Sequence, residues 1–144
     1  MKTVKDLKQA MPRKIANYFV QLLWTIWASP TSVVALFVAC LGIPTGTRLR
    51  WRGTTLEAYG GLINRILELV PVSAVAMTLG HVIWGRSPEI LDECREHEMV
   101  HVRQYERWGP FFIPMYLGFS LWLWWQGKDA YYENPFEKEA YGTD

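Results

Sequence analysis

Cysteine and net charge are both scarce in this chain, and each scarcity excludes a class of function. The two cysteines, Cys40 and Cys94, are too few for a disulfide framework and say little about the cellular compartment. The formal net charge is +1, and no basic cluster alternates with aromatic residues. We therefore expect no nucleic-acid partner, because nucleic acids are bound by concentrated positive surfaces.

Charge is also missing locally, since no charged side chain occurs between Lys14 and Arg48. The uncharged run is too long for the apolar part of a secretory signal, and no small-residue cleavage site closes it. We predict that residues 1–44 form a basic arm, Met1–Lys14, followed by a membrane-embedded segment, Ile15–Pro44. Membrane lipid is then one partner of the protein.

The form of this segment depends on Ser29-Pro30-Thr31 at its centre. One alternative is a single spanning helix kinked at Pro30, and the other is a hairpin of two short helices, Ile15–Ala28 and Thr31–Leu41. Proline disfavours the helical conformation of the residue before it, which supports a break. Basic residues on both flanks favour the hairpin, with both ends and the remaining domain slightly favoured on the cytoplasmic side.

Residues 45–144 are expected to form one domain with a small sheet and several helices. Alternation about Gly53 predicts a β-hairpin from Arg48–Arg52 and Thr55–Tyr59. Leu62–Leu69 fits a helical turn or a strand, and Ala74–Trp84 is expected to be one buried strand. The fold class is therefore α+β and mostly helical.

The second half of the domain is expected to be helical. Ser87 and Pro88 are typical of a helix start, and this helix is predicted to run to Trp108. Phe111–Trp125 is apolar, but its 15 residues are too short to span a core of about 30 Å. We expect it to lie at the membrane interface or to pack on the first apolar segment.

The motif His97-Glu98-Met99-Val100-His101 lies in the predicted helix ending at Trp108. Histidines four residues apart point to the same side of a helix, so both imidazoles can approach one metal ion. Glu98 neighbours the first ligand and is expected to reach a bound water as general base, which is the arrangement of the zinc-protease motif. We therefore predict a Zn²⁺ cofactor.

A third protein ligand is needed to complete such a site. A third histidine six residues beyond His101 is excluded, because Arg107 occupies that position. The remaining solution is a glutamate from a second helix, and the block Glu133–Tyr141 offers three: Glu133, Glu137 and Glu139.

The two blocks together resemble the gluzincin metallopeptidases, whose second motif is close to Glu-x-x-Ala-Asp. In Glu137-Lys138-Glu139-Ala140 the family's ligand position falls on Glu137, so the resemblance implies His97, His101 and Glu137 as the metal ligands. The family's aspartate, which orients a ligand histidine, is replaced by Tyr141. This replacement departs from the family's motif. A tyrosine hydroxyl can accept from an imidazole N–H, though it orients the ring more weakly than an aspartate does, so Tyr141 is a candidate partner of a ligand histidine.

The region Thr78–Tyr141 is also similar to small uncharacterised bacterial membrane proteins that have a His-Glu-x-Val-His-Val-Arg-Gln-Tyr block and a later Asn-Pro-Phe-Glu block. This resemblance implies a shared site and a location at a bacterial inner membrane. It implies no particular activity.

Four further residues are weaker candidates for the site. Hydrolysis of an amide develops an oxyanion, and a donor can share its charge with the metal; His81, Tyr131 and Tyr132 are the candidate donors. For each, ordinary packing is the competing interpretation. Cys94 shares the helical face of His97, but a small buried side chain is the preferred interpretation.

These observations predict a membrane-associated zinc peptidase, with a peptide or membrane-protein substrate and Glu98 as the catalytic base. The first alternative is a non-catalytic zinc-binding membrane protein, which the small size of the chain favours. The second is a zinc hydrolase that acts on a lipid or a non-peptide amide.

Overall fold

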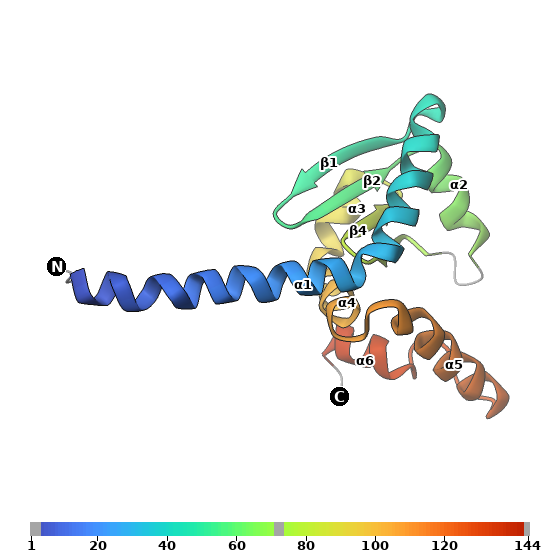
Figure 1. Cartoon of the computed structure of the whole chain (residues 1–144). Coiled ribbons are helices and arrows are strands. Elements are labelled where there is room, and N and C mark those ends of the chain that lie inside the picture. Colours follow the sequence, from blue (N-terminus) through green and yellow to red (C-terminus); the bar gives the residue numbers. More distant parts are fainter. Residues whose placement is uncertain (1–3, 71–73, 143–144) are drawn as a thin grey trace.

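A computed structural model describes residues 4–70 and 74–142 and confirms an α+β fold that is mostly helical (Figure 1). The helices are α1 (Val4–Gly42), α2 (Gly61–Leu69), α3 (Pro88–Glu93), α4 (Arg95–Trp108), α5 (Phe112–Trp125) and α6 (Pro135–Tyr141). The strands are β1 (Arg48–Arg52), β2 (Thr55–Tyr59), β3 (Ala76–Leu79) and β4 (Val82–Gly85). Two short 3-10 helices, Ile43–Thr45 and Gly109–Phe111, follow α1 and α4.

The first apolar segment is one helix, so the favoured hairpin of two short helices is wrong. α1 continues through Pro30 and bends near its middle (Figure 1). A proline inside a helix leaves the carbonyl four residues earlier without its amide donor, and this carbonyl belongs to Ile26. The Ser29 hydroxyl donates to the Ile26 carbonyl at 2.7 Å and so replaces part of the lost bond. The helix begins before the predicted segment, at Val4, and residues 1–3 of the basic arm lie outside the described residues.

The sheet has the order β1-β2-β4-β3. β1 and β2 form the predicted antiparallel hairpin, in which Arg50 lies opposite Glu57. β2 pairs in parallel with β4 in the middle of the sheet, and β3 lies antiparallel to β4 at the edge. The edge strand β3 packs against α4, so it borders the helix that contains the His-Glu motif.

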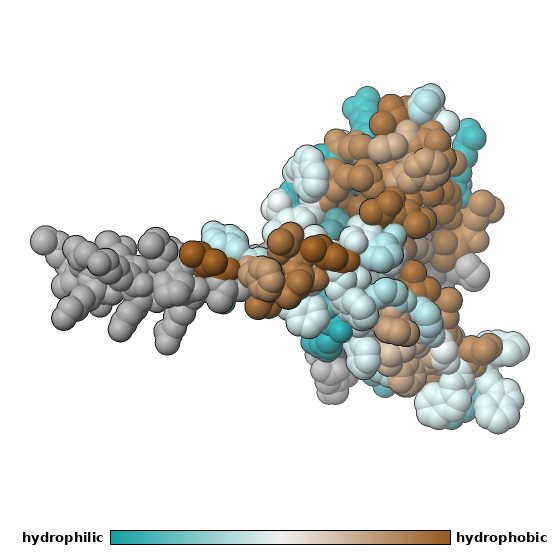
Figure 2. Space-filling view, viewed as in Figure 1, coloured by the Kyte–Doolittle hydropathy of each residue, from teal (hydrophilic) through white to brown (hydrophobic). Residues whose placement is uncertain are grey.

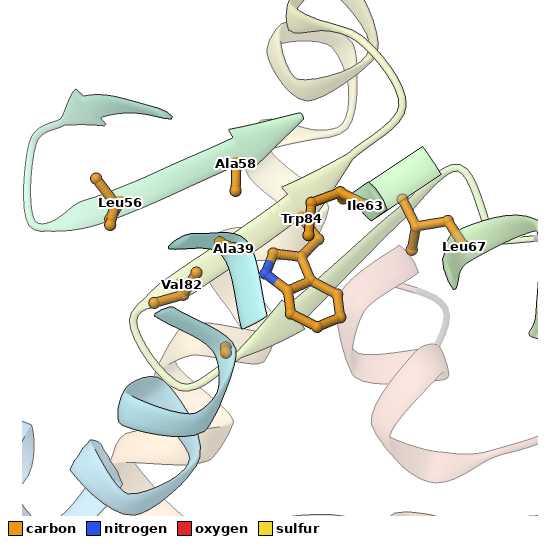
Figure 3. Packing of buried hydrophobic residues seen from close by; sticks show 8 residues of the cluster. Ala39, Leu56, Ala58, Ile63, Leu67, Val82 and Trp84 are labelled. Carbon is orange, nitrogen blue, oxygen red and sulfur yellow. The ribbon is translucent and has the colours of Figure 1, made fainter. Parts of the chain in front are cut away.

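Residues of β4 alternate between the two faces of the sheet and divide the core in two. Val82 and Trp84 pack with Ala39 of α1 and with Ile63 and Leu67 of α2 (Figure 3). On the other face Ile83 packs with Leu91 and Val102, which belong to α3 and α4. The second half of α1 is therefore part of the core of the domain predicted for residues 45–144.

Two predicted elements are divided in the structure. The strand expected over Ala74–Trp84 is a β-hairpin that turns at Gly80 and His81, where Gly80 has a φ of +69°. The helix expected from Pro88 to Trp108 begins as predicted, since the Ser87 hydroxyl accepts from the Ile90 amide. It is then interrupted at Cys94, which separates α3 from α4.

A second apolar cluster joins α1, α4, α5 and α6. Ala28, Tyr105, Phe112 and Phe136 are its buried members. Gly109 allows the close approach of α1, because a Cβ atom there would lie 2.2 Å from the Trp27 indole nitrogen. α5 thus packs partly on the first apolar segment, which was one of the two predicted arrangements.

Large apolar side chains remain exposed on α1 and α5 (Figure 2). Within the described residues, α1 is the one helix that is long and apolar enough to cross a membrane. The stretch from Ile15 to Trp27 exposes apolar side chains almost throughout, and this half of α1 projects from the rest of the molecule (Figure 1). On α5, Leu121, Trp124 and Trp125 are exposed as well.

Candidate metal centre

α4 presents the two motif histidines on one face, as the spacing of four residues predicts. The Nε2 atoms of His97 and His101 lie 3.1 Å apart. His101 is buried, and the side chain of His97 is 18% exposed. The two candidate ligand nitrogens therefore converge on one point.

α6 adds a carboxylate at the same point, and it comes from Glu137. Glu137 Oε2 lies 3.3 Å from His97 Nε2, and Glu137 Oε1 lies 3.5 Å from His101 Nε2. Glu137 is 3% exposed, so it is not a solvated surface charge. Among the described residues these three side chains are the group that could hold a metal ion.

Two signals in the sequence explain why α6 forms and where it lies. Asn134 accepts from the Phe136 amide through its side-chain oxygen, and Pro135 occupies the first helical turn. The side-chain nitrogen of Asn134 donates to the Tyr116 carbonyl at 3.0 Å and to the Ser120 hydroxyl at 2.8 Å. Asn134 thus both caps α6 and attaches it to α5, which fixes the direction of Glu137.

Glu98 lies next to His97 on α4 but points towards the sheet. Its Oε2 accepts a hydrogen bond of 2.7 Å from the Thr78 hydroxyl of β3, and the side chain is buried. Glu98 is not one of the three converging side chains. Thr78 could not be singled out from the sequence, because its partner Glu98 lies on another element.

The electrostatics of the cluster follow from burial and from its close contacts. Burial alone would raise the pKa of Glu137, but hydrogen bonding with His101 and His97 outweighs it and holds this pKa at about 2. Burial alone would lower the pKa of His101, but hydrogen bonding with Glu137 and its charge raise it instead. Burial raises the pKa of Glu98, and the nearby histidines and Thr78 offset this only in part.

Two residues that sequence reasoning missed complete the surroundings of the cluster. Tyr116 of α5 donates a short hydrogen bond of 2.6 Å to Glu137 Oε1. Gln104 of α4 lies 2.8 Å from His101 Nδ1 through its side-chain oxygen. Gln104 could have been found from the sequence, because a residue three positions after His101 lies on the same helical face. Tyr116 is distant in sequence and had no such signal.

The competing glutamates of the third-ligand prediction have other partners. Glu139 Oε2 accepts from the Gln104 side-chain nitrogen at 2.9 Å, and Glu139 Oε1 lies 3.3 Å from Arg107. Glu133 pairs with Lys138 at 2.8 Å on the surface. Both therefore lie outside the three-residue cluster.

The predicted role of Tyr141 requires a correction. Its ring packs against His97 with centroids 4.5 Å apart, while its hydroxyl lies 3.4 Å from that of Tyr131. The buried His97 Nδ1 has no hydrogen-bond partner within the part of the chain described. Tyr141 thus contacts the imidazole as an aromatic ring and does not replace the hydrogen-bond acceptor of the gluzincin motif.

The remaining candidates divide between the site and the rest of the fold. The rings of Tyr131 and Tyr132 pack against the ring of Tyr141, which in turn packs against His97. His81 lies in the turn between β3 and β4 and not on a strand, and its Nε2 is 3.1 Å from Glu106. Glu106 lies more than two helical turns beyond His97, so His81 contacts a different part of α4 from the one that carries His97.

An open groove of about 690 Å³ reaches His97 from the C-terminal end of α6. Its walls include Met99, Val100 and Arg103 of α4, with Glu139 and Tyr141 opposite. The groove is lined by the half-buried candidate ligand His97, whereas the buried Glu98 and His101 do not line it.

Comparison of the chain with protein-family models, curated proteins and solved structures finds no match.

Proposed function

We propose that this chain is a membrane-associated zinc peptidase of the gluzincin type. The observation that supports it best is the convergence of His97, His101 and Glu137 from two helices. Two ligand atoms of a tetrahedral zinc ion, each about 2.0–2.1 Å from the metal, lie about 3.3 Å from one another. The two Nε2 atoms lie 3.1 Å apart, and they approach different oxygens of Glu137, at 3.3 Å for His97 and 3.5 Å for His101. Taken as one ligand atom from each residue, the three donors all lie within 4.8 Å of one another.

The chemistry of the three donors also fits zinc. Two imidazoles and one carboxylate form the ligand set of many catalytic zinc sites, in which the fourth position stays open. Glu137 Oε2 is buried and faces the His97 imidazole at 3.3 Å, but it accepts no hydrogen bond of standard geometry within the described residues, so it has capacity to bind a cation. Burying a carboxylate is costly unless it is paired, and a metal ion beside Glu137 would add to the pairing that Tyr116 and the two histidines give it.

In this proposal His97, His101 and Glu137 hold the ion, and Tyr116 orients Glu137 through its second oxygen. Bound zinc supplies a water of lowered pKa and polarises the scissile carbonyl. Glu98 accepts a proton and returns it to the leaving amine, as general base and then general acid. Thr78 holds the Glu98 carboxylate towards the sheet, and β3 is the edge strand beside which an extended peptide would lie.

The non-catalytic alternative, a zinc-binding membrane protein, has one observation in its favour. Glu98 is only 5% exposed, and the open groove reaches His97 without including Glu98. An enzyme would need substrate binding to open a path to Glu98, whereas a structural zinc site would not. A zinc hydrolase acting on a lipid or a non-peptide amide would use the same residues.

The experiment that separates these functions compares wild type with Glu98→Gln at equal zinc occupancy. Gln keeps the shape of the carboxylate and loses its ability to accept a proton. We expect unchanged zinc content and a loss of peptide hydrolysis of about 10²–10⁴-fold. The assay measures cleavage of a library of extended and membrane-protein peptides by the detergent-purified full chain. Equal cleavage by both proteins would contradict the peptidase mechanism.

The membrane association rests on α1. Its apolar surface from Ile15 to Trp27 is exposed, and exposed apolar surface of this extent is unfavourable in water. The exposed tryptophans of α5, Trp122, Trp124 and Trp125, suit the membrane–water interface. We propose a bacterial inner membrane, with peptide or membrane-protein substrates that reach the site from its surface.

A further inference from the structure

We propose that Gln104 is the positioning residue that fixes the protonated nitrogen of His101 and thereby prepares His101 to bind metal. This inference rests on the zinc site proposed above. Gln104 is completely buried, and its side-chain amide joins α4 to α6. It takes the place that an aspartate has in the resembling family, but from a different element and with different chemistry.

The orientation of the Gln104 amide follows from its α6 partners. Its nitrogen donates to the Phe136 carbonyl at 3.0 Å and to the Glu139 carboxylate at 2.9 Å. Both partners are acceptors, and the second oxygen of Glu139 lies 3.3 Å from Arg107. A flipped amide would place its oxygen against two other oxygens, so the network admits one orientation.

The oriented amide then determines the tautomer of His101. The Gln104 oxygen faces His101 Nδ1 at 2.8 Å, and an oxygen acceptor requires a hydrogen on that nitrogen. In a neutral imidazole the other nitrogen, Nε2, is then free of hydrogen and has its lone pair available. Nε2 is the atom that faces His97 and Glu137, and in the protonated ring it carries a second hydrogen that the Glu137 carboxylate accepts. Once His101 is neutral, Gln104 keeps the remaining hydrogen on Nδ1 and leaves the Nε2 lone pair available to a metal.

The two histidines differ in this respect. His101 has an oriented partner for its second nitrogen, whereas His97 Nδ1 is buried without a hydrogen-bond partner among the described residues. Partners of metal-bound histidines orient the ring, and their loss costs about 10–100-fold in metal affinity. We therefore infer that His101 is the preorganised ligand of the site. Its ring is oriented by Gln104, which is held in turn by Glu139 and Arg107.

The test is the proton position on His101 in the detergent-purified full chain, read from imidazole ¹⁵N chemical shifts. The chain has only three histidines, so His81→Gln and His97→Asn variants assign the signals. In metal-free wild type at alkaline pH we expect the hydrogen of His101 on Nδ1. In Gln104→Leu we expect a mixture of tautomers and a zinc affinity about 10–100-fold weaker.

Two further variants separate positioning from general structural damage. Gln104→Glu keeps an acceptor for His101 Nδ1 but cannot donate to Phe136 and Glu139, so we expect the Nδ1–H tautomer in a less stable protein. Gln126→Leu makes the same substitution as Gln104→Leu at an exposed position, and we expect wild-type zinc affinity. A hydrogen on Nε2 in metal-free wild type would overturn the inference, as would wild-type zinc affinity in folded Gln104→Leu. If wild type binds no zinc, the proposed function fails, while the proton position on His101 still decides the tautomer claim.

Discussion

The hydroxyl of Thr78 donates to Glu98 Oε2 at 2.7 Å and joins the edge strand β3 to α4, the helix of His97 and His101. Because both residues are buried, this hydrogen bond is shielded from water. The same hydroxyl lies 3.2 Å from the Glu98 carbonyl. The position of the proposed base is therefore set by the sheet as well as by α4.

Thr78→Val tests this contact, because valine keeps the shape of threonine and removes its hydroxyl. Glu98 would remain buried without its donor, and we expect a loss of about 1–3 kcal/mol in the free energy of unfolding. Zinc content should remain that of wild type, since Thr78 contacts none of the proposed ligands. Denaturant unfolding and elemental analysis measure the two quantities. A variant as stable as wild type would show that the contact has little energetic role.

Asn134→Ala should weaken both the fold and the metal site. The substitution removes the cap of α6, which is worth about 0.5–2 kcal/mol, and also the donors to Tyr116 and Ser120. Because Glu137 lies on α6, zinc affinity should fall together with stability. Thermal unfolding with and without added zinc measures both effects. The matched control is Lys138→Ala on the same helix, whose exposed side chain pairs with Glu133, and we expect it within about 0.5 kcal/mol of wild type.

The membrane contact of α1 predicts that the chain stays in the membrane fraction after alkaline carbonate washing. Leu22 and Leu23 are exposed within the uncharged stretch. Each charge placed at the centre of a membrane helix costs about 2.5–3.5 kcal/mol, so Leu22→Asp with Leu23→Asp should release the protein. Trp51→Asp, at an exposed position on β1, is the control and should stay bound. Wild type in the soluble fraction would contradict the membrane assignment.

The ligand helix was predictable because its information is local. His97 and His101 share a face of α4 through helical periodicity alone. Ser87 and Pro88 mark the start of α3, which Cys94 separates from α4. The resemblance added Glu137, and the structure places that residue in the same cluster as the two histidines. Gln104 lies one turn after His101 and has a signal of the same local kind.

Two predicted elements differ from the structure, the break at Pro30 and the single strand over Ala74–Trp84. Pro30 predicted a break in α1, but Ser29 supplies a donor to the freed carbonyl and the helix continues. Gly80 followed by His81 is a two-residue turn between short strands, and a glycine at the first turn position is its signature. Tyr141 and Tyr131 could not be placed from sequence, since their pairing depends on how α6 packs against the preceding turn.

Metal content is the most direct test of the central claim that His97, His101 and Glu137 form a zinc site. Elemental analysis of the detergent-purified chain should give about one zinc per chain for wild type. His97→Ala, His101→Ala and Glu137→Ala should each lose most of it, while Glu133→Ala, four residues before Glu137 and exposed, should retain it. Zinc absent from wild type, or retained equally by Glu137→Ala and Glu133→Ala, would contradict the account.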